Sequence, residues 1–378
     1  MIQPTAGRIH GVSSIPVMTE LPYIERQNLL RQRLEREGLT HFLVSSLPNV
    51  RYLCGFSGTH ALLLIGLEKN VIVSDGRYAE QIQSEVVGAE LELQGRRKDS
   101  ETIGDVLSNA SGLKIGFEGQ HISVERHKNL VGLSSDHEWV SCVNWVEDLR
   151  IRKDASEVAL LRESLQLAED AFEKVLPEIQ EGMTERELAH RLEELMWQAG
   201  AEKESFETLV LFGSRSSLPH GKPSDFKLAK GMPLLMDFGC LWKGYCSDIT
   251  RTVFWGEPGA EFRDAYRVVR DANLAACETI HGGLTCRDAD AAARSVIEKA
   301  GRGDLFVHSL GHGVGLEVHE MPRLAPTEEG MLEQGMVVTI EPGIYAPDWG
   351  GIRIENMAVI TNDSCDVLNR TSTEITLL

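Results

Sequence analysis

The sequence predicts two domains, an α/β domain over residues 21–148 and an α+β domain over residues 149–378. A chain of 378 residues exceeds the size of a comfortable single hydrophobic core. Strand and helix patterns alternate in the first part, and the second part repeats a helix–helix–hairpin unit. Residues 1–20 precede both domains and are expected to form a loosely ordered extension.

The first domain begins with a helical pattern over residues 21–38, in which Leu29, Leu30 and Leu34 share one side. Short apolar runs then indicate strands, and an amphipathic segment between them indicates another helix. This alternation is typical of an α/β domain. The expected strands are residues 41–46, 60–67, 70–75 and 114–119, and the expected helix is residues 76–86.

A charged stretch at residues 147–157 marks the predicted domain boundary and opens a long helical region. Beyond it, residues 181–200 and 282–301 share four residues at a constant spacing. Each copy follows another helical segment, at about 157–176 and 262–280. The shared residues are Gly182, Thr184, Arg186 and Gly200, which recur as Gly283, Thr285, Arg287 and Gly301.

A strand pattern repeats as well, and it carries acidic residues, which strands disfavour. GMPLLMDFG at 231–239 aligns with GMVVTIEPG at 335–343, so Asp237 corresponds to Glu341. Further along each copy, Asp248 in SDI corresponds to Glu355 in IEN. We therefore interpret the second part as an internal duplication with two carboxylate-bearing hairpins, rather than a coincidence of common patterns.

Two registers are possible for the first hairpin. A turn at residues 242–243 would set Asp237 directly opposite Asp248, and a turn at residues 243–244 would make them diagonal neighbours. Both registers place the two side chains on one face, because side chains alternate with a period of two. In the second hairpin, Arg353 lies two residues before Glu355 and so shares its face.

Carboxylates this close repel each other unless a cation lies between them, and buried carboxylates are tolerated when they coordinate a metal. Four carboxylates balance the charge of two divalent cations. Oxygen ligands suit Mn²⁺, Mg²⁺ or Ca²⁺, and an imidazole moves the preference toward Mn²⁺, Co²⁺, Fe²⁺ or Zn²⁺. A lone buried Asp is usually hydrogen-bonded structure, but four matched carboxylates favour a dinuclear metal site.

The segment FVHSLGHGVGLEVHE at residues 306–320 supplies imidazoles in His308, His312 and His319. Its glycines disfavour a helix, it lacks the HExxH motif, and its GxGxG differs from the dinucleotide-binding spacing. A Gly-rich segment lets the backbone pass close to a crowded site. The similar SLPHG at residues 217–221 adds His220.

Four segments, DFGCLWKGYCSDITRT, HSLGHGVGLEVHE, TIEPGIY and GIRIEN, resemble the metal-ligand motifs of the creatinase/prolidase/aminopeptidase P/methionine aminopeptidase superfamily. This resemblance covers about residues 150–378 and implies the pita-bread fold for the α+β domain. Upstream, NVRYLCGFSGTHALLLIG and VIVSDGRYAEQ resemble the creatinase-like N-terminal domain of aminopeptidase P and prolidase enzymes. Methionine aminopeptidases lack that domain and creatinase lacks the complete metal set, so both fit less well.

The resemblance implies a role for each ligand position. Asp248 and Glu355 would bridge two metal ions, and Asp237 would complete the shell of one ion. His312 and Glu341 would complete the shell of the other. A metal-bridging hydroxide would attack the scissile carbonyl, with Glu341 as general base and proton shuttle.

The remaining matched residues would act on the substrate. His220 and His319 would contact the substrate carbonyl and the tetrahedral intermediate. His308 would shape the pocket for the proline ring. Arg353 would hold Glu355 or a neighbouring carboxylate, with binding of a substrate carboxylate as a weaker alternative.

The predicted function is a dinuclear metallo-exopeptidase that hydrolyses Xaa-Pro bonds at peptide N-termini, as aminopeptidase P does, with Mn²⁺ as the expected ion. The alternative is an Xaa-Pro dipeptidase (prolidase); a creatinase-like hydrolase and a non-catalytic peptide-binding module are further alternatives. An Xaa-Pro bond has no N–H to recognise, so a pocket fitted to the pyrrolidine ring could supply selectivity. The resemblance also implies a homodimer.

Composition excludes several other partners. A net charge of −19 argues against nucleic acid and anionic membranes. No apolar run approaches the roughly 18 residues of a membrane helix, and the N-terminus lacks the pattern of a secretory signal. The seven cysteines are scattered without a CxxC pair, which fits reduced thiols. We therefore expect a cytoplasmic enzyme whose substrates are small peptides with proline at the second position.

Overall fold

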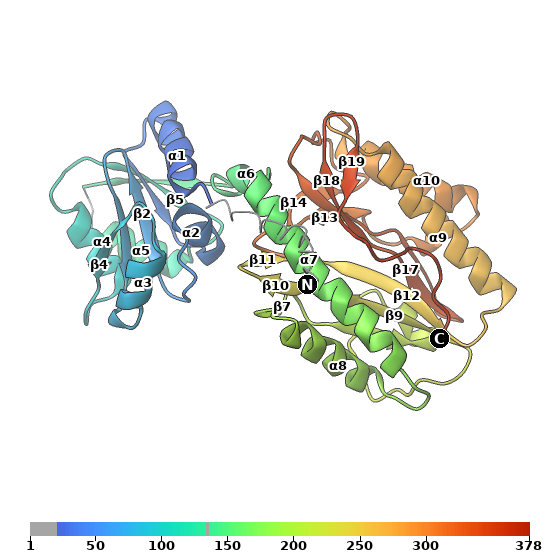
Figure 1. Ribbon diagram of the computed structural model, residues 1–378. Helices are drawn as coiled ribbons and strands as arrows, with labels where there is room; N and C mark the ends of the chain where they lie inside the picture. Colours follow the sequence, from blue (N-terminus) through green and yellow to red (C-terminus); the bar gives the residue numbers. More distant parts are fainter. Residues whose placement is uncertain (1–20, 134–135) are drawn as a thin grey trace, which may run out of the picture.

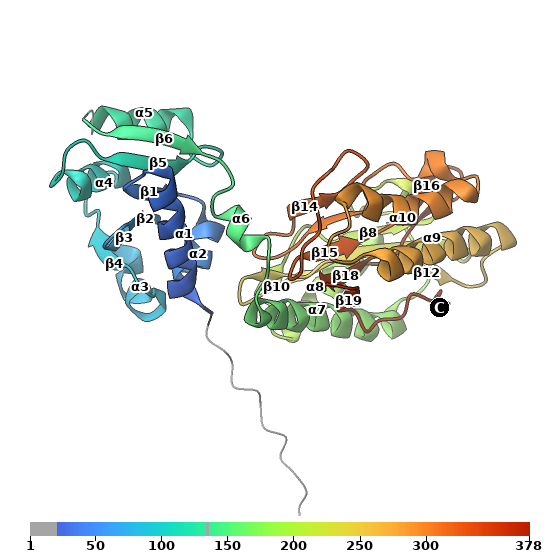
Figure 2. The same cartoon turned by 90° about the horizontal axis from the view of Figure 1, so that it is seen from above.

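The computed structural model describes residues 21–133 and 136–378 as two domains joined by a short helical segment (Figures 1 and 2). The extension expected at residues 1–20 lies outside the described residues. The N-terminal domain contains strands β1 (His41–Val44), β2 (Leu62–Gly66), β3 (Asn70–Ser74), β4 (Glu90–Leu93), β5 (Lys114–Glu118) and β6 (Glu138–Cys142), and helices α1 (Tyr23–Glu37), α2 (Leu47–Cys54), α3 (Ala79–Glu85), α4 (Asp99–Leu107) and α5 (Val124–Leu133).

The strands of the N-terminal domain form one sheet in the order β4-β3-β2-β1-β5-β6. Alternation along the strands divides the core between its two faces. Phe42 packs in a cluster with Leu30 of α1, and the adjacent Leu43 packs in another with Ile103 of α4. Helices therefore cover both faces of the sheet, as Figure 2 shows, and the α/β prediction is confirmed.

One detail of the first helix is corrected. Leu30 and Leu34 are fully buried, whereas Leu29 is 42% exposed. Residues four apart lie on one face of a helix, and the residue before them is turned away by about 100°. The predicted apolar side was therefore right for Leu30 and Leu34 and wrong for Leu29.

The C-terminal domain consists of two copies of a helix–helix–hairpin unit. Thr184 and Thr285 each cap the second helix of their copy, because each hydroxyl accepts a hydrogen bond from the backbone N–H of the third helical residue. The four glycines of the repeat all have positive φ. The helices are α7 (Ala155–Val175) and α8 (Glu185–Gln198) in the first copy and α9 (Ala260–Thr279) and α10 (Cys286–Lys299) in the second; α6 (Glu147–Arg150) joins the domains.

Each copy packs its helices on its own strands. Leu165 and Leu188 share a buried cluster with Leu234, whereas Val269 and Ala289 share another with Ile340. The duplicated pita-bread prediction is therefore confirmed. The strands are β7 (Lys203–Glu204), β8 (Leu209–Phe212), β9 (Met232–Phe238), β10 (Cys240–Trp242), β11 (Tyr245–Cys246), β12 (Ile249–Trp255), β13 (Gly311–Gly313), β14 (Glu320–Leu324), β15 (Val337–Ile340), β16 (Gly343–Ala346), β17 (Gly350–Arg353), β18 (Asn356–Ile360) and β19 (Cys365–Val367).

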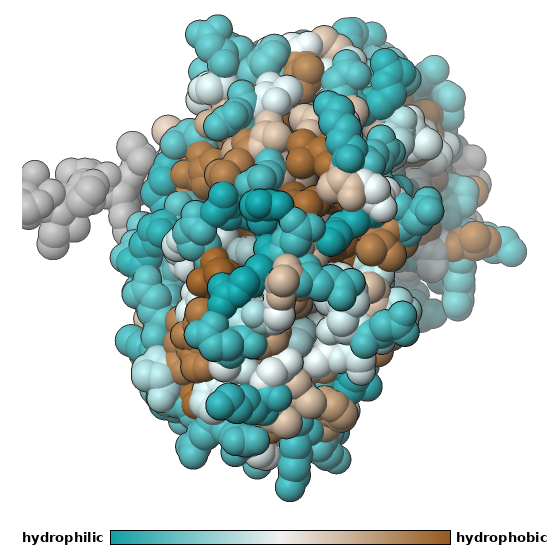
Figure 3. Space-filling model, turned by 90° about the vertical axis from the view of Figure 1, so that its right-hand side faces the viewer, coloured by the Kyte–Doolittle hydropathy of each residue, from teal (hydrophilic) through white to brown (hydrophobic). Residues whose placement is uncertain are grey.

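The surface is largely hydrophilic on the face that Figure 3 shows. On the face in Figure 3, apolar residues lie in small groups separated by hydrophilic side chains. Scattered exposed apolar residues are normal on protein surfaces. None of the helices within residues 21–133 and 136–378 combines the length and apolar character needed to cross a membrane.

Candidate metal centre and substrate cavity

The first carboxylate hairpin turns at Lys243 and Gly244, which have φ values of 47° and 86°. Positive φ at both central residues is the conformation of a tight two-residue hairpin turn. In this register Asp237 of β9 lies opposite Thr250 of β12. Asp248 is therefore the diagonal neighbour of Asp237, as expected for the second of the two possible turns.

The second carboxylate hairpin interrupts its ladder where its acids lie. Glu341 follows β15 directly, and Glu355 lies between β17 and β18. The pairs on either side, Ile340 with Asn356 and Gly343 with Arg353, place Glu341 and Glu355 opposite each other.

Three of the four acids therefore lie at strand ends rather than inside strands, which corrects the sequence prediction. Asp237 alone lies within a strand, and Asp248 falls between β11 and β12. The backbone explains why: the N–H of Glu355 donates to the carbonyl of Thr250 at 3.1 Å, and that of Glu341 donates to Leu310 at 2.8 Å. These bonds join the hairpins to other segments and draw the acids together.

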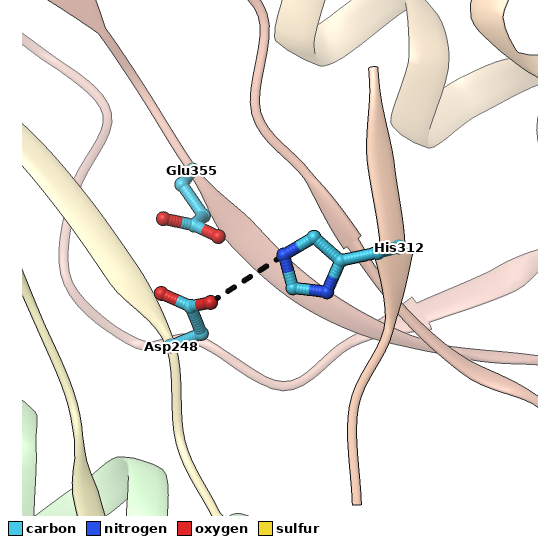
Figure 4. Close-up of side chains that lie close together, drawn as sticks. All are labelled: Asp248, His312 and Glu355. Atoms are coloured by element: carbon cyan, nitrogen blue, oxygen red, sulfur yellow. Dashed lines mark ion pairs between the residues drawn. The ribbon is translucent and has the colours of Figure 1, made fainter. Parts of the chain in front are cut away.

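Three side chains converge from separate elements (Figure 4). One ligand atom from each of Asp248, His312 and Glu355 lies within 4.8 Å of the others. His312 Nε2 is 3.6 Å from Asp248 Oδ2 and 3.4 Å from Glu341 Oε1. One imidazole and several carboxylates thus surround one point.

Arg353 links the remaining acid to this group. Its Nη2 pairs with Asp237, and its Nε donates to Thr250 Oγ1 at 3.0 Å. The Thr250 hydroxyl in turn donates to Glu355 Oε2 at 2.7 Å. Arg353 therefore holds Asp237 directly and Glu355 through Thr250.

The four carboxylates outnumber Arg353, the buried arginine whose guanidinium pairs with Asp237 and lies near Glu341. Burial and repulsion between neighbouring carboxylates raise the pKa of Asp248 and of Glu355 well above the usual range. Burial also raises the pKa of Glu341 to about 7, although Arg353 opposes it. Asp237 Oδ1 and Glu355 Oε1 are buried without a hydrogen-bond partner among the described residues, which is costly unless a cation binds them. These residues fit a divalent metal ion.

His308 is held as a neutral ring. Its Nδ1 lies 2.8 Å from the carbonyl of Ser309 and so carries the proton, which leaves Nε2 to accept from the Tyr345 hydroxyl at 2.8 Å. The Tyr345 oxygen accepts from Arg353 Nη1 at 2.7 Å. Burial lowers the pKa of His308 to about 4. The sequence analysis did not predict Tyr345. It lies four residues after Glu341, and residues an even number apart along a strand share a face, so this spacing was the available signal.

All nine sequence-predicted site residues line one cavity of about 930 Å³. His319 packs its ring against His312, with centroids 4.4 Å apart. The sequence analysis missed several other lining residues. These are Arg323 of β14 and, from the N-terminal domain and the junction, Gln120, His121, Asn144, Glu147 and Arg150.

Glu320 borders this cavity and gives a pH-dependent prediction. Burial alone would raise its pKa, but Lys153 and Arg150 outweigh burial and lower the pKa to about 2. Between pH 4.5 and about 2, Glu320 is therefore protonated in the unfolded chain but remains ionised in the native state. Stability from this group is present above pH 4.5 and is lost as the pH falls toward 2.

We expect Glu320→Gln to lower the free energy of unfolding at neutral pH by about 3 kcal/mol. The difference from the parent protein should shrink as the pH falls through this window. Urea unfolding at a series of pH values measures it. If the free energies of unfolding of the two proteins instead differed by the same amount at every pH, the lowered pKa of Glu320 would be contradicted.

The sequence and the fold are similar to those of known peptidases. The model of metallopeptidase family M24 matches residues 159–362, and that of the creatinase/prolidase N-terminal domain matches residues 26–152. An Xaa-Pro dipeptidase of Pyrococcus furiosus is 36% identical over 93% of this chain and 99% of its own. An Xaa-Pro dipeptidase structure from Bacillus anthracis is similar with a TM-score of 0.90, 36% identity and coverage of 94% and 100%. An X-Pro aminopeptidase structure from Thermotoga maritima has a TM-score of 0.86, 32% identity and coverage of 92% and 100%.

Proposed function

Because the chain belongs to metallopeptidase family M24, with a creatinase/prolidase N-terminal domain, it is a metallo-exopeptidase, and we propose that it hydrolyses Xaa-Pro dipeptides. The similar proteins named above include two Xaa-Pro dipeptidases and one aminopeptidase. The dipeptidase thus replaces the aminopeptidase that the sequence alone favoured. The observation that carries this choice is the positively charged side chain of Arg323, which lines the cavity.

A dipeptidase needs a group for the free carboxylate of proline, which lies three bonds from the scissile carbonyl carbon. Arg323 faces His312 directly across the β13–β14 pair, so both side chains share one face. It is exposed and lines the cavity. Among the described residues it has no acidic partner within ion-pair distance, whereas Arg150, Lys222 and Arg353 in the same cavity each have one.

The proposal includes two divalent metal ions, with Mn²⁺ favoured by a mostly oxygen ligand set and one imidazole. When bound, such ions acidify a water molecule and polarise the scissile carbonyl. Elemental analysis after metal loading tests their number and identity. The residues that would hold them are Asp237, Asp248, His312, Glu341 and Glu355.

The chain's own groups would complete the reaction. A Glu341 carboxylate oxygen would accept the proton of the attacking water and deliver it to the proline nitrogen, which leaves as a secondary amine. His220 and His319 line the cavity and would donate to the oxygen of the tetrahedral intermediate. The neutral His308 ring, with its Nε2 already bonded to Tyr345, would present a wall to the pyrrolidine ring.

Arg323→Gln is expected to lower kcat/KM for an Xaa-Pro dipeptide by about 10- to 100-fold, because a charge-assisted contact to the substrate carboxylate is lost. The C-terminal amide of the same dipeptide has no carboxylate, and its slower hydrolysis should change little. Steady-state kinetics on both substrates measures the difference. The control is Lys222→Gln, which removes a cavity cation already paired with Glu207. Equal losses on dipeptide and amide would contradict the role of Arg323.

An Xaa-Pro aminopeptidase is the second candidate. The cavity volume of about 930 Å³ is large for a dipeptide alone, since pockets for whole drug-sized ligands span a similar range. Faster cleavage of a tripeptide than of the matching dipeptide would favour this candidate. It would also leave Arg323 without a substrate carboxylate at that position.

A further inference from the structure

A chain of hydrogen bonds runs from the core of the N-terminal domain to its junction with the catalytic domain. Asn49 of α2 is fully buried. Its amide nitrogen donates to Glu118 Oε1 at 2.6 Å and to Glu147 Oε1 at 2.7 Å. Its amide oxygen accepts from Arg150 Nη1 at 2.7 Å. Glu118 and Glu147 therefore orient the Asn49 amide, and the amide oxygen holds the Arg150 guanidinium.

The other side of Arg150 reaches the loop that carries His319. Its Nη2 donates to Glu317 Oε2 at 2.8 Å and to Glu320 Oε1 at 2.5 Å. The second oxygen of Glu320 accepts from Lys153 Nζ at 2.9 Å. The Arg150 side chain is only 3% exposed. The fork of one buried arginine thus holds both glutamates that flank His319.

The loop itself is closely folded over Glu320. A Cβ at residue 315 would lie 2.7 Å from both carboxylate oxygens of Glu320, so only glycine at this position lets the loop backbone lie so close to that carboxylate. Residues 314–319 contain no helix or strand. Backbone bonds hold the first part of this segment, because the N–H of Cys246 donates to the carbonyl of Gly315 at 2.8 Å and the N–H of Gly315 donates to that of Glu317 at 3.0 Å. The part that carries His319 is held by the side-chain contacts of Glu317 and Glu320 with Arg150.

His319 has little else to place it. Within the part of the chain that the structure describes, its ring contacts His312 at a centroid distance of 4.4 Å, and no hydrogen bond to its nitrogens is present. Its side chain is exposed to the cavity. The position of the imidazole therefore follows from the position of residues 317 and 320.

We propose that Asn49 and Arg150 are positioning residues, through which the N-terminal domain sets where His319 meets the substrate. The inference rests on the proposed function, in which His319 contacts the reacting carbonyl. Lysine at position 150 would keep the charge but could not span Asn49 and two glutamates, because its ammonium lacks the planar fork. A displacement of about 1 Å at a reacting group can cost roughly 100-fold in rate.

A double-mutant cycle tests the relay. We expect Arg150→Lys to lower kcat on an Xaa-Pro dipeptide by about 10- to 100-fold with a smaller change in KM. In a His319→Ala background, Arg150→Lys should cause no further loss, because its effect passes through His319. The matched control is Arg152→Lys, in the same junction, because neither Arg152 nor its partner Glu333 lines the cavity; it should leave kcat unchanged.

Two further measurements keep the test decisive. Glu317→Ala removes one contact of Arg150 at a side chain that is 45% exposed, so it decides the cycle if Arg150→Lys fails to fold. The imidazole NMR signal of His319, assigned by its absence in His319→Ala, should shift in Arg150→Lys and not in Arg152→Lys. Independent losses in the cycle or an unmoved His319 signal would overturn the relay. A parent protein that cleaves no Xaa-Pro substrate would overturn the proposed function, and the NMR comparison would still judge the relay.

Discussion

Replacing Asp248 by alanine is expected to abolish hydrolysis while leaving the chain folded. Asp248 lies on the first carboxylate hairpin, between β11 and β12, and its Oδ2 is 3.6 Å from His312 Nε2. In the proposed dinuclear site the loss of Asp248 would weaken metal binding as a whole, so kcat/KM should fall by roughly 1000-fold or more, which corresponds to about 4 kcal/mol. Steady-state kinetics with added Mn²⁺ and elemental analysis of bound metal measure the two consequences.

The fold should survive this change, because burial and neighbouring acids already disfavour the charged form of Asp248. The native circular dichroism spectrum should therefore be retained. Asp366→Ala provides a control, since that aspartate pairs with Arg162 at an exposed position on β19. Near-normal turnover by the Asp248 variant would remove the dinuclear proposal.

Arg353→Met is expected to destabilise the metal-free protein. Arg353 is the buried cation among Asp237, Asp248, Glu341 and Glu355, and its side chain is 4% exposed. Removing one partner of a buried ion pair leaves an uncompensated charge, so the free energy of unfolding should fall by about 3–5 kcal/mol. Bound metal would neutralise the same acids, so saturating Mn²⁺ should restore part of the loss.

Urea unfolding with and without Mn²⁺ measures both effects. Arg162→Met is the matched control, because its pair with Asp366 is exposed and surface pairs contribute little. A loss of stability in Arg353→Met that is equal with and without metal would contradict the view that arginine and metal neutralise the same acids.

The carboxylates could be found from the sequence because duplication provides two aligned copies of one pattern. Asp237 and Glu341 occupy the same place in GMPLLMDFG and GMVVTIEPG, and the structure brings all of the predicted acids to one cavity. The hairpin register could not be decided by alternation, since both turns place the acids on one face. The glycine of the Lys243-Gly244 turn was the local signal that favoured the observed register.

The cavity-lining residues of the N-terminal domain and the junction could not be predicted from local sequence patterns. Arg150 bonds to Asn49 across 101 residues and to Glu317 across 167, and no periodicity relates such positions. The proposed change from aminopeptidase to dipeptidase also rests on a feature that the sequence does not show. That proposal depends on Arg323, for which only the structure shows that no acidic side chain among the described residues lies within ion-pair distance. The domain boundary between residues 148 and 149 stays a prediction.

The most direct test of the central claim is the hydrolysis of an Xaa-Pro dipeptide beside the matching Xaa-Pro-Xaa tripeptide, with Mn²⁺ and with a chelator. A metal-dependent dipeptidase should cleave the dipeptide faster, and the chelator should stop the reaction. Faster tripeptide cleavage that the chelator stops would make the protein an aminopeptidase. Cleavage of neither peptide by the metal-loaded protein, or cleavage that survives complete chelation, would contradict a metal-dependent Xaa-Pro peptidase.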